Sequence, residues 1–112
     1  MSEFTYLFRG RQTSASPEQR QKHLEKWVVW FKELGAQGHV KDPGHPLERS
    51  GKLVKRQQKV VTDGPFAEAK DVVGGYTLVN ARDLDHAVEL SRGCPIFDVG
   101  GQVEIRPVMK MG

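Results

Sequence analysis

Three side chains in this sequence have the chemistry for acid–base work on a small anion: His23, Asp63 and Arg20. Arg20 and His23 are three residues apart in a segment with helical periodicity, so we expect them on neighbouring positions of one helix surface. If Asp63 reaches this surface, its carboxylate would orient the imidazole, and Arg20 would hold an anionic substrate through paired hydrogen bonds. The pattern predicts proton transfer on a small carboxylate or phosphate compound, with His23 and Asp63 as catalytic residues.

The turn that carries Asp63 is rigid, because it reads Asp63-Gly64-Pro65-Phe66. Pro65 has a fixed φ and no backbone donor, and it restricts the residue before it to extended conformations. The turn therefore places Asp63 where a strand ends. The same geometry is equally suited to a structural turn in which Asp63 accepts hydrogen bonds from its own backbone amides and Phe66 enters the core. The residues alone leave both interpretations open.

Four side chains are predicted to contact a substrate: Arg20, Trp27, Trp30 and Phe66. Trp27 shares the apolar face of the predicted helix, where we expect it to reach the core. Trp30 falls on a different part of the helix, facing either a subunit contact or the cleft. The alternative interpretation of the polar residues is a cluster that ties the helix to the Asp63 turn without any chemistry.

No metal site or cofactor site is predicted. His39, Asp42 and His45 are close in sequence, but their spacing matches no zinc pattern, and solvated loop histidines explain them. A glycine-rich phosphate-binding loop is missing from the sequence. The basic run of Lys52, Lys55, Arg56 and Lys59 has no aromatic residues that would stack on bases, so protection of a strand edge explains it better than nucleic-acid binding.

The composition describes one ordinary domain that spans residues 1–112. Apolar residues make up 38% and charged residues 28% of the sequence, and the net charge is only +3. Cys94 is the single cysteine, so an intramolecular disulfide is impossible and a reducing compartment fits. We read no signal peptide at the start, and no apolar run approaches the ~20 residues of a membrane span. The cytoplasm is the expected location.

The elements that must position these side chains follow from local patterns. Residues 4–8 are rich in strand-forming residues. A helix begins at Ser16-Pro17 with a capping box completed by Gln19. Its apolar face is predicted from helical spacing to consist of Leu24, Trp27, Val28, Phe31 and Leu34. Residues 38–52 are predicted as loop with room for a short extended piece. After them we expect one strand or a strand pair at 52–61, a strand at 72–79, a helix at 83–93 and a final strand at 103–108.

This order predicts an α+β fold of the ferredoxin-like type, with two helices on one face of an antiparallel sheet. The other face then needs a cover. We expect Tyr6, Phe8, Tyr76 and Leu78 to form that uncovered apolar face. A second copy of the chain is the simplest cover, so the sequence predicts a homodimer.

Several of these residues together resemble one known family. The segment around Asp63-Gly64-Pro65-Phe66, followed by Gly74-Gly75-Tyr76, is similar to the branch of the YCII-related family that contains the motif Asp-Gly-Pro-Phe. The resemblance continues in segments spread over nearly the whole chain, namely Ser16-Pro17-Glu18, His23, Trp27, residues 83–90, Cys94-Pro95 and residues 101–108. Arg20 departs from the family pattern, which usually has an apolar residue there, and the His-, Lys- and Pro-rich loop at 38–52 is unusual as well.

The resemblance implies a dimeric α+β barrel, in which a His on the first helix and an Asp near the sheet are the suspected active-site groups. His23 and Asp63 stand at the matching positions. It also implies bacterial relatives encoded near extracytoplasmic-function sigma factors. Two functions therefore compete: a small-molecule-binding protein or enzyme that uses the His23–Asp63 pair, and a non-catalytic regulatory module that binds another protein such as a sigma factor.

Overall fold

The computed structural model describes residues 1–10, 16–54, 61–63 and 72–111, with 61–63 described as backbone. Its elements follow in this order: β1 (Ser2–Arg9), α1 (Pro17–Ala36), β2 (Val40–Asp42), β3 (Lys52–Val54), β4 (Val61–Asp63), β5 (Val73–Ala81), α2 (Leu84–Ser91), the short 3₁₀-helix η3 (Pro95–Val99) and β6 (Gln102–Pro107). Phe66 and most of its turn lie outside the described residues.

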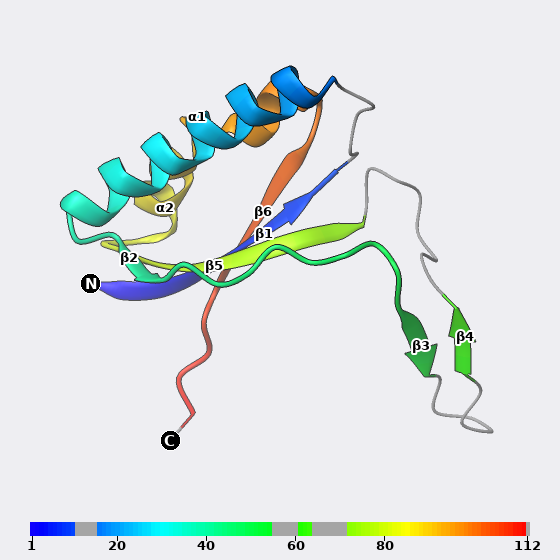
Figure 1. Ribbon diagram of the computed structural model, residues 1–112. Helices are drawn as coiled ribbons and strands as arrows, with labels where there is room; N and C mark the ends of the chain where they lie inside the picture. The colour runs from blue at the N-terminus through cyan, green and yellow to red at the C-terminus, as the bar shows by residue number, and fades with distance from the viewer. Residues whose placement is uncertain (11–15, 55–60, 64–71, 112) are drawn as a thin grey trace.

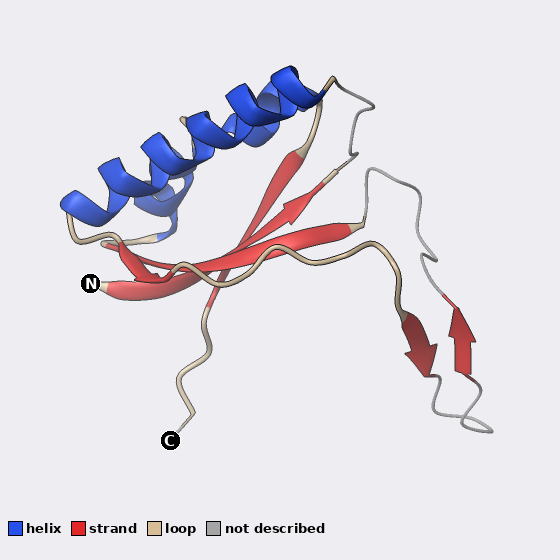
Figure 2. Cartoon of the chain, viewed as in Figure 1, coloured by secondary structure: helices blue, strands red, loops and turns tan. Residues whose placement is uncertain are grey.

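Four of the strands form one antiparallel sheet in the order β2-β5-β1-β6. Figure 1 shows α1 and α2 together on one side of this sheet, and Figure 2 shows the same two layers by element type. With β3 and β4 set aside, the chain runs β-α-β-β-α-β, and β5 and β1 are the two central strands. This is the ferredoxin-like α+β arrangement, so the predicted fold class is confirmed.

The start of α1 is fixed by its own sequence. Ser16 accepts a hydrogen bond from the backbone N–H of Gln19 at 3.2 Å, and the Gln19 side chain accepts one from the Ser16 backbone at 3.0 Å. Pro17 occupies the first turn, where its missing donor does no harm. The predicted capping box is confirmed. Neither α1 nor any other helix of the described ranges is long and apolar enough to span a membrane.

An aromatic layer between β1 and α1 forms the core. Phe4, Tyr6 and Phe8 alternate along β1 and are all buried. The Tyr6 ring stacks on Trp30 of α1 with centroids 6.2 Å apart, and the Phe8 ring meets Trp27 edge-on at 5.0 Å. The Tyr6 hydroxyl donates a hydrogen bond to the carbonyl of Ala87 in α2 at 2.5 Å, which ties the second helix to the same strand.

The prediction that Tyr6 and Phe8 lie on the uncovered face of the sheet is wrong. In the observed register Leu7 pairs with Tyr76, and Tyr6 pairs with Thr77. Paired residues project from the same face of a sheet, so Tyr6 and Tyr76 must lie on opposite faces. Tyr6 and Phe8 belong to the helix side, whereas Tyr76 and Leu78 are on the uncovered side as predicted.

The face of the sheet away from the helices has an apolar centre and charged margins. Leu7, Tyr76 and Leu78 are half-buried and form the centre. A Lys41–Glu3 ion pair of 3.8 Å lies toward one edge of the sheet. Toward the other edge, Arg9 pairs with Glu104 at 2.7 Å. No described helix lies on this side (Figure 1).

The buried stripe of α1 also differs from the predicted one. Trp30 and Leu34 are buried, and Trp27 and Phe31 pack beside them. Leu24 and Val28, which were predicted on the inner face, are 56% and 49% exposed. The inner line of the helix therefore runs through 23, 27, 30 and 34, because the aromatic residues of β1 meet the helix along that line.

The fourth strand of the main sheet is β2, which lies within the region predicted as loop. Past β2 the chain still follows β5: Thr77 Oγ1 donates to the Pro43 carbonyl at 2.8 Å, and the Leu47 N–H donates to the Gly74 carbonyl at 2.8 Å. The sequence allows a short extended piece here, but Pro43, Gly44 and Pro46 interrupt any longer strand pattern, so it does not indicate that the segment forms an edge of the main sheet. Of the two alternatives predicted for residues 52–61, the strand pair is present: β3 and β4 form a separate two-stranded antiparallel sheet.

Gly44 is required where this edge segment crosses Tyr76. Its φ is +67°, and a Cβ would lie 2.0 Å from the Tyr76 carbonyl oxygen. Gly38 has a similar φ of +79°, but a Cβ there would meet nothing within 4 Å. Gly38→Ala should therefore lower the free energy of unfolding by about 1 kcal/mol, which is the strain of a left-handed backbone at a residue with a Cβ. Gly44→Ala should cost about 3 kcal/mol or more, because a clash adds to the strain. Urea unfolding measures both, and equal losses would contradict the described path of residues 43–47.

Cys94 is a buried free thiol at the start of η3. Burial raises the pKa of this thiol to about 12. A backbone hydrogen bond from Ile96 lowers the pKa, and the nearby Asp98 raises it further. The unfolded thiol has a pKa of about 8.5. Above about pH 9 the unfolded chain has released this proton while the folded chain keeps it, so stability falls as pH rises toward about 12. Stability measured between pH 7 and 11 should decline less steeply in Cys94→Ala than in the unchanged protein. Parallel curves would show that the thiol does not contribute.

Candidate functional site

His23 and Trp27 form the polar contact at the centre of the candidate site. They are one helical turn apart on α1, and both are half-buried. The indole Nε1–H of Trp27 donates a hydrogen bond to Nε2 of His23 at 3.0 Å. The two rings meet edge-on with centroids 6.3 Å apart. The spacing of i and i+4 places them on the same side of the helix.

The position of Trp27 is set by rings from two elements. Phe8 of β1 contacts it at a centroid distance of 5.0 Å, and Trp30 and Phe31 of α1 lie at 5.8 and 5.9 Å. Phe8 is one residue before the end of β1. His23, one turn nearer the start of α1, is therefore at the end of the sheet where β1 stops and β5 and β6 begin.

Arg20 lies three residues before His23 on α1, and its side chain is exposed. The two residues are neighbours on the helix surface, as predicted. Arg20 engages in contacts of its own. A guanidinium here and an imidazole one turn later give this end of the helix two groups that can donate hydrogen bonds to an anion.

Asp63 is the last residue of β4, and its backbone pairs with Lys52 of β3. Figure 1 shows β3 and β4 standing away from α1, on the far side of the sheet from the helices. The described part of one chain therefore does not bring Asp63 to His23. Residues 64–71, which include the predicted contact residue Phe66, lie between β4 and β5 and outside the described ranges. The roles of Asp63 and Phe66 stay predictions.

Trp30 is 5% exposed and belongs to the core, where it stacks on Tyr6. Trp27, which was expected to reach the core, packs against it while its indole N–H faces His23. Of the two tryptophans, Trp27 is thus the one in direct contact with the candidate catalytic side chain. A contact of either ring with substrate remains a prediction.

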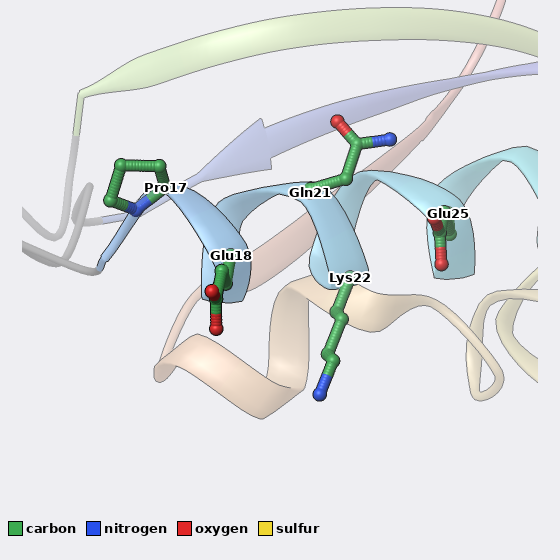
Figure 3. Close-up of a pocket in the computed structure, with 5 residues that line it drawn as sticks. All are labelled: Pro17, Glu18, Gln21, Lys22 and Glu25. Carbon is green, nitrogen blue, oxygen red and sulfur yellow. The ribbon is translucent and has the colours of Figure 1, made fainter.

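The surface hollows that involve α1 lie elsewhere. One is lined by Pro17, Glu18, Gln21, Lys22 and Glu25. Figure 3 shows Glu18 and Lys22 projecting from the same side of the helix, and all five residues are exposed. Another lies between α1 and the segment that joins α2 to η3, with Trp30 and Phe97 in its wall. His23 lines neither of these two hollows, and its side chain is half-buried.

Metal ligation finds no support in the described ranges, where no three His, Cys, Asp or Glu side chains come together. His39 instead packs edge-on against His86 at 5.1 Å, and its Nδ1 contacts the Asn80 carbonyl at 3.0 Å. His86 accepts a hydrogen bond from the Arg82 backbone at 3.0 Å. These imidazoles join the start of β2 to the start of α2. His45 lies apart from them, beside Tyr76.

The sequence interpretation missed the hydrogen bond between Trp27 and His23 and the role of Phe8 beneath it. The spacing of four residues between a donor-only indole and an imidazole was a usable signal for the first. The second had no local signal, because it depends on which face of β1 meets the helix. That choice is made by strand register, a contact between distant parts of the chain.

Comparisons with known proteins place the chain among its relatives. The family model described as the YCII-related domain matches residues 3–112. A sequence search of curated proteins finds no match. Among solved structures, the chain is similar to 5-chloro-2-hydroxyhydroquinone dehydrochlorinase from Burkholderia phenoliruptrix AC1100, solved with 2,5-dihydroxybenzoquinone. The TM-score is 0.51 at 15% identity, and the match covers 98% of this chain and 95% of that one.

The structural likeness at this identity supports the α+β fold and carries no activity across. The family match is of a different kind, because it extends over nearly the whole sequence, from the first strand through both helices to the last strand. The resemblance inferred from His23, the Asp63 turn and the segments that follow is confirmed. The chain belongs to the YCII-related domain family.

Proposed function

We propose that this protein binds a small anionic compound at the first turns of α1, with His23 and Arg20 as the groups that hold it. The observation that carries this proposal is the half-buried imidazole of His23, fixed by Trp27 at the open end of the sheet. Arg20 adds a guanidinium one turn earlier, which suits a carboxylate or phosphate oxygen. The start of a helix also favours negative charge.

Acid–base chemistry on the bound compound is part of the same proposal, with Asp63 as the partner carboxylate of His23. The solved dehydrochlorinase was crystallised with a dihydroxybenzoquinone. A hydroxyquinone is acidic and exists as an anion near neutral pH, so it belongs to the class of ligand that His23 and Arg20 would hold. This likeness supports including hydroxyquinones among the test compounds beside simple carboxylates and phosphates.

Binding can be tested by NMR titration of the imidazoles with inorganic phosphate, benzoate and 2,5-dihydroxybenzoquinone. We expect one of these anions to shift the His23 resonances while those of His39, His45 and His86 stay in place. His23→Ala should weaken binding about tenfold or more, since a hydrogen bond to a charged group contributes about 1.5–3 kcal/mol. Arg20→Lys keeps the charge but loses the bidentate geometry, so it should weaken binding less than Arg20→Gln.

The control for these variants is His45→Ala, which removes an imidazole from the edge segment beside β5. It should leave the affinity unchanged. Unaltered binding in His23→Ala would refute the proposed site. A loss in Asp63→Asn equal to that in His23→Ala would support the pairing of the two residues, and no loss would remove Asp63 from the proposal.

A second candidate function is the non-catalytic regulatory module, and an exposed patch on α1 favours it. Leu24 and Val28 are one turn apart and about half exposed, and a contiguous exposed apolar surface is typical of an interaction site. A sigma factor is the partner that this alternative proposes, in the cytoplasm, where a free thiol such as Cys94 is common. Failure of every anion to perturb His23, together with capture of such a partner that Leu24→Ser abolishes, would favour this function.

We also propose that two copies associate through the uncovered face of the sheet. Leu7, Tyr76 and Leu78 at its centre are only half-buried in one chain, and the charge pairs Lys41–Glu3 and Arg9–Glu104 at its margins suit a polar rim. Size-exclusion chromatography with light scattering should give a dimer. Leu78→Asp should give a folded monomer, because it places a charge at the centre of the contact. Val28→Asp, on the outer side of α1, should remain dimeric; a monomer in the unchanged protein would refute the proposal.

A further inference from the structure

We propose that Trp27 is a positioning residue that selects the tautomer of neutral His23 with its proton on Nδ1, so that the site presents an N–H donor to its ligand. The tautomer of His23 follows from the structure by itself, and only the presence of an anionic ligand at Nδ1 rests on the proposed function. The juxtaposition that carries it is the 3.0 Å hydrogen bond from Trp27 Nε1 to His23 Nε2.

The direction of this hydrogen bond is decided by chemistry. An indole nitrogen donates and has no lone pair to accept with. Nε2 of His23 must therefore accept, which requires its lone pair. A neutral imidazole carries one proton, and with Nε2 occupied as an acceptor that proton is on Nδ1. If Nε2 also carried a proton, it would have no lone pair left to accept the hydrogen bond from Trp27.

Trp27 is held well enough to impose this choice. Its ring is packed against Phe8 from β1 and against Trp30 and Phe31 from its own helix, at centroid distances of 5.0 to 5.9 Å. Phe8 is 7% exposed and Trp30 is 5% exposed, so both are parts of the core. The indole therefore gains its orientation from the fold, independently of any ligand.

Nδ1 of His23 is the ring nitrogen that remains for a ligand. Among the contacts of the described residues, Nδ1 makes no hydrogen bond. The ring is half-buried, and it sits at the end of the sheet rather than under it. An N–H in this position fits a ligand oxygen that accepts, such as a carboxylate, phosphate or phenolate oxygen.

The role of His23 changes as a consequence. A neutral imidazole with its proton on Nδ1 and its lone pair engaged by Trp27 is a hydrogen-bond donor that polarises an oxygen, not a base that removes a proton. Neutral histidines are known to serve in this way in enzymes. Any proton removal at the site would then fall to a carboxylate, for which Asp63 is the candidate, while His23 and Arg20 hold the developing or existing anion.

The decisive measurement is the tautomer of His23 in the unchanged protein. Long-range ¹H–¹⁵N correlation at pH 8, where an ordinary imidazole is neutral, distinguishes a protonated nitrogen from one with a lone pair. We expect Nδ1 of His23 to be the protonated nitrogen. The indole N–H of Trp27 should also exchange with solvent more slowly than the indole N–H of a short, unstructured peptide that contains tryptophan. If Nε2 of His23 carries the proton in the unchanged protein, that result alone overturns the inference.

Trp27→Phe tests whether the indole imposes the tautomer. It keeps an aromatic ring against Phe8 but removes the donor, so the form with the proton on Nε2 should become populated. Phe31→Leu is the matched control, because it removes another ring that contacts Trp27 and leaves the donor in place. It should keep the proton on Nδ1. An unchanged tautomer in Trp27→Phe would show that Trp27 does not position the imidazole.

The same variants separate this inference from the proposed function. If benzoate, phosphate or the hydroxyquinone binds at His23, Trp27→Phe should weaken that binding about three- to tenfold, the effect of one well-placed hydrogen bond, and Phe31→Leu should not. If none of the three anions binds while the Nδ1 proton is found, the proposed function fails and the positioning role of Trp27 stands. If an anion binds equally well to Trp27→Phe, the presented N–H has no part in recognition and the inference fails.

Discussion

The rest of the structure depends on one layer of aromatic packing, in which alternate residues of β1 lie under a line of large side chains on α1. Tyr6 packs against Trp30, and Phe8 packs against Trp27. Because side chains alternate along a strand, this contact also decides the other face of β1. Leu7 is turned to the uncovered side, where it meets Tyr76. A single choice of face thus sets the core, the open side of the sheet and the position of His23.

The parts of the fold that the sequence predicts are those with local signals. The capping box at Ser16, the helical spacing after it and the turn residues around the later strands each depend on a few neighbouring residues. The family resemblance was also local in this sense, since it came from short segments, and it carried the expected two-helix, antiparallel architecture. His23 could be singled out because an imidazole beside an apolar helical stripe is uncommon, and its neighbour Arg20 followed from helical geometry.

The parts that failed depend on contacts between distant segments. Tyr6 and Tyr76 were predicted on one face as apolar residues of two strands, but their relative register is fixed only when β1 pairs with β5. Val40 begins a strand of the main sheet because β5 offers it an edge, although Pro43 and Gly44 follow at once. Leu24 and Val28 fit the helical period as well as Trp30 does. The larger aromatic surface of Trp30 decides which side of α1 is buried.

His23 and Asp63, which the sequence interpretation paired, belong to different parts of the described fold. His23 gains its orientation from Trp27, and Trp27 gains its own from the core, so one half of the cluster is as rigid as the fold. Asp63 belongs to the β3–β4 hairpin, which pairs with no strand of the main sheet, and a two-stranded hairpin alone is only marginally stable in water. Within the described residues, the fold therefore fixes the imidazole of His23, whereas the backbone of Asp63 lies in a separate pair of strands. A carboxylate held permanently beside His23 and Arg20 would compete with any anionic ligand for the same hydrogen-bond donors.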